Sequence, residues 1–269
     1  MSVDLAKRSD MRLALFQLEA IIEGIHADEY IIREGMNIDL QHMVLDMASE
    51  HKPHFFNAYP HLPELDDENR DGNNAVLDDN SYTRPLDRAY QIETTLKHYT
   101  FDTLWGKWDE YLWTIKDVGD HKTYKSLYQM ATGDYNSPKE FGLFRMTEIK
   151  SKELPHTKAV AYHDHIPSHE KHFLRGELLI SIRMMLSQLK KKRYRPHMIA
   201  PVLLFSIIGK QGRVLESYFD GKHLVLRRTK TYDFRNDPSA FRDFAEWYLG
   251  DPAGDTTSLK EEYMLRLHE

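Results

Sequence analysis

The chain has 269 residues, of which 41% are hydrophobic and 12% aromatic, and it contains no cysteine. This composition can bury a substantial core, and the lack of thiols excludes disulfides, zinc–thiolate centres, iron–sulfur clusters and cysteine nucleophiles. The formal net charge of -6 excludes a uniformly basic nucleic-acid binder but allows a local basic surface. The first ten residues carry charges where a secretory signal needs an apolar run, and no apolar run approaches the roughly 20 residues of a membrane span. Together with the lack of cysteine, this leads us to expect a cytoplasmic protein with no membrane partner.

The first half of the chain is predicted to be mainly helical. Apolar residues at helical spacing indicate helices over 11–25 and 38–47, the second with Asn37 as its N-cap. Residues 62–80 carry seven carboxylates and are interpreted as an exposed loop, since their spacing matches no known calcium loop. Helical patterning resumes from Leu86 to about Met130. Its apolar stripe is interpreted as core and consists of Leu104, Trp105, Trp108, Leu112 and Ile115.

The second half alternates between strand and helix patterns. Strands are predicted over 141–150 and 159–163, followed by a long helix with an apolar face from Leu174 to Leu189. Three further strands are predicted over 198–208, 213–219 and 224–232, with the Asp220–Gly221 turn as a hairpin signal. A last helix over 238–249 would have Asp237 as its N-cap and Gly250 as its stop.

These elements predict an α/β (α+β) protein in which a helical N-terminal half packs on a core of strand, helix, three-stranded meander and helix. The expected organisation is a helical region over 1–60, an acidic flexible loop over 61–82, the core with its leading helices over 83–250, and a tail over 251–269. Together they are expected to form one domain.

The segment Thr147-Glu148-Ile149-Lys150 at the end of the first predicted strand of the core is the best candidate for chemistry. Because side chains alternate along a strand, Glu148 and Lys150 are expected to project from the same face. A carboxylate in that position can hold a cation, and an ammonium can steady a phosphate.

This segment and the order of the elements around it resemble the PD-(D/E)XK nuclease-like superfamily, in the layout found in many fungal proteins. The resemblance covers roughly 133–249. It implies a metal site formed by Asp134 and Glu148 with Mg²⁺ as cofactor, and a catalytic role for Lys150. The further glutamate expected on an early helix could be Glu93, Glu110 or neither.

A second resemblance is to the fungal arginine-containing cyclodipeptide synthases, which join amino acids from charged tRNA into a diketopiperazine. It is carried by residues 173–179 and 201–208, with Tyr218-Phe219-Asp220-Gly221 and Tyr232-Asp233-Phe234 after them. It implies an aminoacyl-tRNA partner, a small amino-acid-derived substrate, and no cofactor. Selecting an arginyl group would require a carboxylate that can accept a bidentate guanidinium bond, for which Glu148, Glu177 and Asp134 are candidates.

Holding tRNA would also require cations on its phosphate backbone. The densest basic feature is the end of the long predicted helix, and Lys122 and Lys125 are possible additions. The predicted tRNA-binding residues are Lys190, Lys191, Lys192, Arg193 and Arg195.

Histidines gather at 156, 163, 165, 169 and 172, between the two candidate glutamates. They match no known zinc pattern and are interpreted as a surface loop. Their position leaves His163 and His165 as candidates for substrate binding or proton transfer, because imidazole titrates near neutrality.

The sequence therefore leaves three hypotheses. The first is a tRNA-dependent cyclodipeptide synthase that uses Glu148, Lys150, Asp134 and Glu177. The second is a magnesium-dependent nuclease, and the third is a non-catalytic module that binds nucleic acid or protein. The sequence does not determine the oligomeric state.

Overall fold

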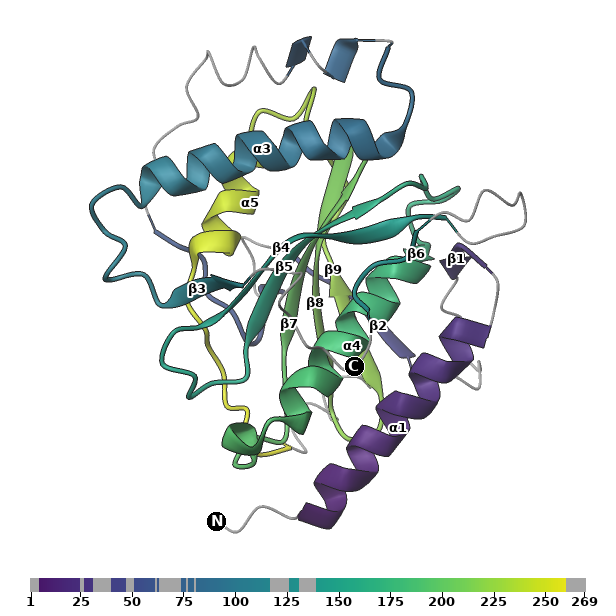
Figure 1. Ribbon diagram of the computed structural model, residues 1–269, viewed down its shortest axis with the longest axis vertical. Helices are drawn as coiled ribbons and strands as arrows, with labels where there is room; N and C mark the ends of the chain where they lie inside the picture. The colour runs from purple at the N-terminus through teal and green to yellow at the C-terminus, as the bar shows by residue number, and fades with distance from the viewer. Residues whose placement is uncertain are drawn as a thin grey trace.

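The computed structural model describes residues 5–24, 27–30, 40–46, 51–60, 62, 74–75, 77–79, 81–116, 126–130 and 139–259. Within them the chain forms a mixed α/β fold in which helices cover both faces of a mixed sheet (Figure 1). No helix in these ranges is both long enough and apolar enough to cross a membrane. The elements are α1 (Leu5–Gly24), β1 (Glu29–Tyr30), β2 (Leu40–Val44), α3 (Pro85–Thr103), β3 (Trp113–Lys116), β4 (Phe141–Ile149), β5 (Thr157–His163), β6 (Phe173–Leu174), α4 (Arg175–Lys190), the 3₁₀ helix η1 (Lys192–Tyr194), β7 (Val202–Ile208), β8 (Gln211–Phe219), β9 (Leu224–Arg228), β10 (Tyr232–Asp233) and α5 (Ala240–Leu249).

The main sheet has the strand order β2-β9-β8-β7-β5-β4-β3, with β10 paired to β8. Two neighbouring pairs are parallel, β2 with β9 and β5 with β7, and the others are antiparallel. The parallel step from β5 to β7 requires a crossover, and α4 provides it. The short strands β1 and β6 form a separate antiparallel pair beside the start of α4.

Each face of the sheet has its own hydrophobic core. Figure 1 shows α3 and α5 together on one side of the sheet and α4 with α1 on the other. Side-chain alternation along β5 divides its residues between these cores, so that Val160 joins the α3 and α5 core whereas Ala159 and Ala161 join the α4 and α1 core. We call these the α3 face and the α4 face of the sheet.

The elements predicted for the second half of the chain are confirmed. Strands β4 and β5, helix α4, the meander β7–β8–β9 and helix α5 all occur in the expected order. Gly209 and Gly221 take positive φ angles, 63° and 103°, in the two turns of the meander. The last helix begins slightly later than expected, with Ser239 at its N-cap, and the Asp237 carboxylate accepts hydrogen bonds from the Ser239 backbone and hydroxyl.

Two predictions for the first half are wrong. Residues 40–44 form strand β2 and not a helix, because they pair in parallel with β9 over five residues. Such a tertiary pairing overrides the local helical pattern. Asn37, the N-cap expected for that helix, lies outside the described residues.

The long helix predicted over 86–130 is also shorter than expected. It ends at Thr103 with Leu104 as its C-cap, and Gly106, two residues further on, has a φ angle of 76°, which favours glycine and does not occur within a helix. The expected apolar stripe is therefore not one helix face. Trp105 is 83% exposed, and Ile115 belongs to the edge strand β3.

Candidate functional site

Glu148 lies near the end of β4 and is buried on the α4 face, with 3% of its surface exposed. Its Oε1 atom forms an ion pair with the Lys191 ammonium and accepts a hydrogen bond from Gln188 Nε2 at 3.0 Å. Burial lowers the pKa of Lys191, and the Glu148 charge only partly reverses this. The carboxylate is therefore engaged by the C-terminal end of α4.

Lys150 lies in a different environment from Glu148. Strand β4 ends at Ile149, so the alternation that would place both side chains on one face stops before Lys150. Lys150 sits in an exposed turn, and its ammonium donates to the Trp108 carbonyl oxygen at 2.5 Å. Asp134, the third residue expected at this site, lies outside the described residues, as do Lys122 and Lys125.

Glu177 in the first turn of α4 forms a fully buried pair with Arg213 of β8. Its two carboxylate oxygens accept bonds from Arg213 Nε at 2.8 Å and Nη2 at 2.6 Å, and Oε2 also accepts the Leu174 backbone N–H at 2.8 Å. Burial alone would raise the pKa of Glu177, but Arg213 keeps it below the usual value. The bidentate guanidinium bond expected for a substrate is thus made by the protein's own arginine.

The prediction that all five histidines lie in a surface loop is wrong for His156 and His163, which are buried, whereas His165, His169 and His172 lie in the loop between β5 and β6. His165 Nε2 and His172 Nδ1 lie 2.6 Å and 2.5 Å from the Glu29 carboxylate, which also accepts the Ser168 backbone N–H and hydroxyl. Burial opposes ionisation of Glu29, but these hydrogen bonds lower its pKa to about 2. Glu29 thereby ties the loop between β5 and β6 to β1, in keeping with the loop interpretation of this segment.

His163 is separate from this cluster and is buried at the end of β5. Burial lowers its pKa to about 4, so the imidazole is neutral at pH 7. It packs against the first turn of α4, where a Cβ atom on Gly176 would lie only 2.8 Å from the ring. Over the ranges that the structure covers, no three His, Asp or Glu side chains are arranged to hold a metal ion.

The basic run at the end of α4 is largely exposed. Lys190, Lys192, Arg193 and Arg195 face solvent, whereas Lys191 turns inward to Glu148. Arg8 of α1 reaches the same end, where it donates to the Leu189 carbonyl oxygen at 2.8 Å and to that of His197. Cations gathered at a helix C-terminus are stabilised by its dipole.

Sequence reasoning missed a buried polar group on the α3 face. Lys158 of β5 is fully buried. Its Nζ atom donates to the carbonyl oxygens of Tyr248, at 2.9 Å, and Gly250, and lies 4.1 Å from the Trp113 ring centroid. Burial holds the pKa of Lys158 well below its usual value. The available signal was a single charged residue within an otherwise buried strand.

Arg145 of β4 is another buried basic residue on the α3 face. Its Nε atom lies 2.9 Å from Glu93 Oε1 of α3, and its guanidinium lies 4.3 Å from the Tyr248 ring centroid. Glu93, one of the two candidates for the early-helix glutamate, is thus paired with an arginine. Glu110, the other, lies in a turn after α3.

No protein-family model matches this chain, and no curated protein or solved structure shows significant similarity to it.

Proposed function

We propose that the protein binds the phosphate backbone of tRNA through the exposed basic end of α4 and uses the attached aminoacyl groups to form a cyclic dipeptide. The observation that carries the proposal is the group of four exposed cations formed by Lys190, Lys192, Arg193 and Arg195. These cations are concentrated at one helix end, although the chain has a net charge of -6. Such a local basic surface is suited to bind the phosphates of a nucleic-acid backbone.

The chemistry proposed needs neither ATP nor a metal ion, because an aminoacyl ester is already activated. The α-amine of one aminoacyl group attacks the ester carbonyl of another, forms a peptide bond and releases one tRNA with a free 3′-terminal hydroxyl. The remaining α-amine then attacks the dipeptidyl ester, closes the ring and releases the second tRNA. Positioning and proton transfer are what the protein must supply.

The contacts of the candidate carboxylates limit their part in this reaction. Glu148 and Glu177 are both paired with internal cations, Lys191 and Arg213, so their ionised forms are stabilised by the fold. In the proposed enzyme they are positioning residues. Glu177 orders the start of α4, and Glu148 orders the basic end of α4 through Lys191.

The first test is tRNA binding by fluorescence anisotropy over a series of salt concentrations. The variant replaces Lys190, Lys192, Arg193 and Arg195 with glutamine, and a matched control replaces Lys107, Lys139, Lys152 and Lys222, which are also exposed. Each lost phosphate contact should reduce the slope of log Kd against log salt by about 0.7–0.9, so the basic variant should lose about 3 units of slope and the control little. Equal slopes for the two variants would contradict the proposed surface.

The second test is mass spectrometry of small molecules made by the purified protein from charged tRNA. A cyclic dipeptide that is absent with uncharged tRNA is expected. Tight tRNA binding without any such product would leave a non-catalytic nucleic-acid interaction module, the third hypothesis from the sequence.

The order of the elements favours one alternative activity, a magnesium-dependent nuclease. The succession α3, β3, β4, β5, α4, β7 in a mixed sheet supports the resemblance to the PD-(D/E)XK nuclease-like fold. In this alternative Asp134 and Glu148 would hold Mg²⁺ and Lys150 would steady the phosphate. The Lys191 ammonium on Glu148 weighs against it, because the metal would have to displace that cation. Cleavage of nucleic acid that is abolished by a chelator and by Glu148→Ala would establish it.

A further inference from the structure

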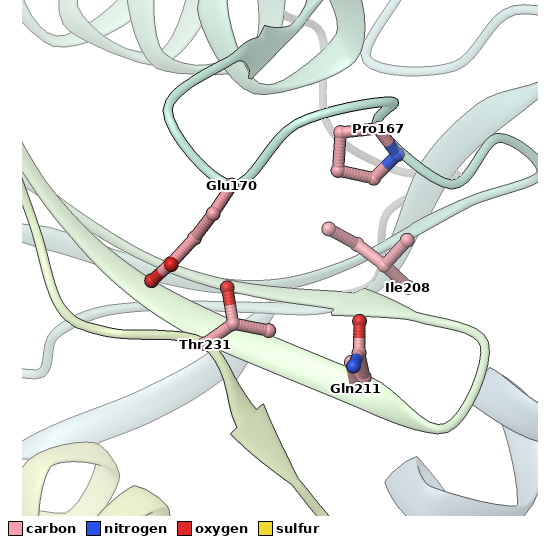
Figure 2. A pocket seen from close by; sticks show the side chains of 5 residues that line it. All are labelled: Pro167, Glu170, Ile208, Gln211 and Thr231. Carbon is pink, nitrogen blue, oxygen red and sulfur yellow. The ribbon is translucent and has the colours of Figure 1, made fainter.

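An open pocket of about 320 Å³ lies between the loop that joins β5 to β6 and the hairpin of β7 and β8. Figure 2 shows Glu170 and Thr231 on one side of it and Pro167, Ile208 and Gln211 on the other. The volume is at the lower end of the range for small-molecule sites, about 300–1,000 Å³. The pocket therefore has room for a small organic ligand.

The loop that carries Glu170 is held at both ends. Arg213 Nη1 donates to the Glu170 carbonyl oxygen at 3.1 Å and Nη2 to that of His172 at 2.8 Å, and Arg213 is itself fixed by Glu177. At its other end the loop is bound to Glu29 through Ser168 and His165. A wall fixed in this way is preorganised, so little entropy is lost when a ligand binds.

The polar groups that line the pocket favour a positive ligand. Glu170 contributes a carboxylate, and the Thr231 hydroxyl and the Gln211 amide oxygen can accept further hydrogen bonds. The neighbouring Arg213 is neutralised by its two bonds to Glu177. The charge of Glu170 also raises the pKa of Arg228 of β9, although burial lowers it more. The Arg228 guanidinium lies 5.6 Å from the Phe173 ring centroid, and Arg228 does not line the pocket.

We infer that this pocket binds a small organic cation, with an ammonium or guanidinium head on Glu170 and an aliphatic stem against Pro167 and Ile208. A carboxylate binds either head through charge-assisted hydrogen bonds, and a guanidinium can bind it through two at once. The inference goes beyond the proposed function and is independent of it, since a free cation would bind whether or not the basic end of α4 binds RNA.

The test is an NMR titration of the full chain with three probes that share one stem: n-butylguanidinium, n-butylammonium and n-butanol. Saturable shifts of the Gln211 and Thr231 amides are expected with one or both cations and not with the neutral alcohol. The stronger of the two cations identifies the preferred head group. No saturable shift with either cation, or equal binding of the alcohol, would overturn the inference.

The variant for this test is Glu170→Gln, with Glu153→Gln as the matched control because Glu153 is equally an exposed glutamate on a different loop. Loss of the charge-assisted bond should weaken cation binding about tenfold or more in Glu170→Gln, and the affinity of Glu153→Gln should be unchanged. Thr231→Val should weaken binding less. Since Glu170 is exposed, its replacement should leave the thermal midpoint of unfolding unchanged, so that lost binding reports on the pocket. An unchanged cation affinity of the Glu170→Gln variant would show that the cation binds elsewhere and would overturn the inference.

Discussion

The two faces of the sheet treat buried charge in different ways, and two glutamate–arginine pairs show the difference. On the α4 face Glu177 accepts two bonds from Arg213 and one backbone N–H, and its pKa lies below the usual value. On the α3 face Glu216 of β8 accepts one bond from Arg227 of β9 at 2.7 Å, the Phe55 N–H at 2.7 Å and the His54 N–H. Burial raises the pKa of Glu216 despite Arg227.

Both glutamates are fully buried and both face an arginine, so burial and charge type do not explain the opposite shifts. The geometry of the contacts does. A bidentate fork delivers two charge-assisted bonds to Glu177, which outweigh the cost of its desolvation, whereas a single bond from Arg227 does not outweigh that of Glu216. The Glu177–Arg213 pair therefore favours its ionised carboxylate, and the Glu216–Arg227 pair does not.

The largest expected effect is a difference between Glu177→Gln and Glu216→Gln. The first leaves Arg213 buried without its anion and should reduce the free energy of unfolding by about 3–5 kcal/mol at pH 7. The second also leaves a buried arginine, Arg227, without its anion, but it removes a carboxylate whose ionised form burial disfavours, so it should reduce the free energy of unfolding by less than the first. Urea denaturation at pH 7 measures both. Equal losses would show that the bidentate geometry is not what distinguishes the two faces.

Glu29 extends the comparison, because hydrogen bonds lower its pKa and stabilise its ionised form. Its pKa falls from 4.5 to about 2 on folding, so the unfolded chain binds a proton more readily than the folded chain. The resulting stability is fully present above pH 4.5 and is lost as the pH falls towards 2. Glu29→Gln should therefore lower the free energy of unfolding by about 2–3 kcal/mol at pH 6, with little difference from the native protein near pH 2. A constant difference over that range would contradict this account.

The sequence predicted the second half of the fold because its elements are long and their patterns agree with their tertiary setting. Helix α4 and the β7–β8–β9 meander combine strong periodicity with clear turn residues. Strand β2 could not be predicted in this way. Its pairing partner β9 begins at Leu224, so its conformation depends on a contact far along the chain. The end of α3 did have a local signal, the glycine at position 106.

The candidate site was predicted only in part, for a similar reason. Glu148 was recognisable by its spacing to Lys150 at the end of a predicted strand, and Glu177 by its place in the segment 173–179. Their partners Lys191 and Arg213 lie 43 and 36 residues further along the chain, and no local pattern connects them. What the sequence presented as free carboxylates the fold uses as internal ion pairs, and the pocket at Glu170 forms only where the loop meets the hairpin.

Lys158 gives the smallest expected effect and tests the α3 face directly. Burial lowers the pKa of Lys158 well below the usual 10.5. At a pH between the lowered pKa and 10.5, the unfolded chain carries a proton on Lys158 that the folded chain lacks. Stability should then rise with pH towards 10.5, at up to about 1.4 kcal/mol per pH unit from this residue. Lys158→Met should remove that rise below pH 10.5, as measured by urea denaturation at each pH. The lost hydrogen bonds should cost little, because Trp113 Nε1 still donates to the Gly250 carbonyl oxygen at 2.9 Å.

If the variant kept the slope of the native protein, Lys158 would have to be charged in the fold, and the carbonyl oxygens and the Trp113 ring would then be sufficient to stabilise a buried ammonium.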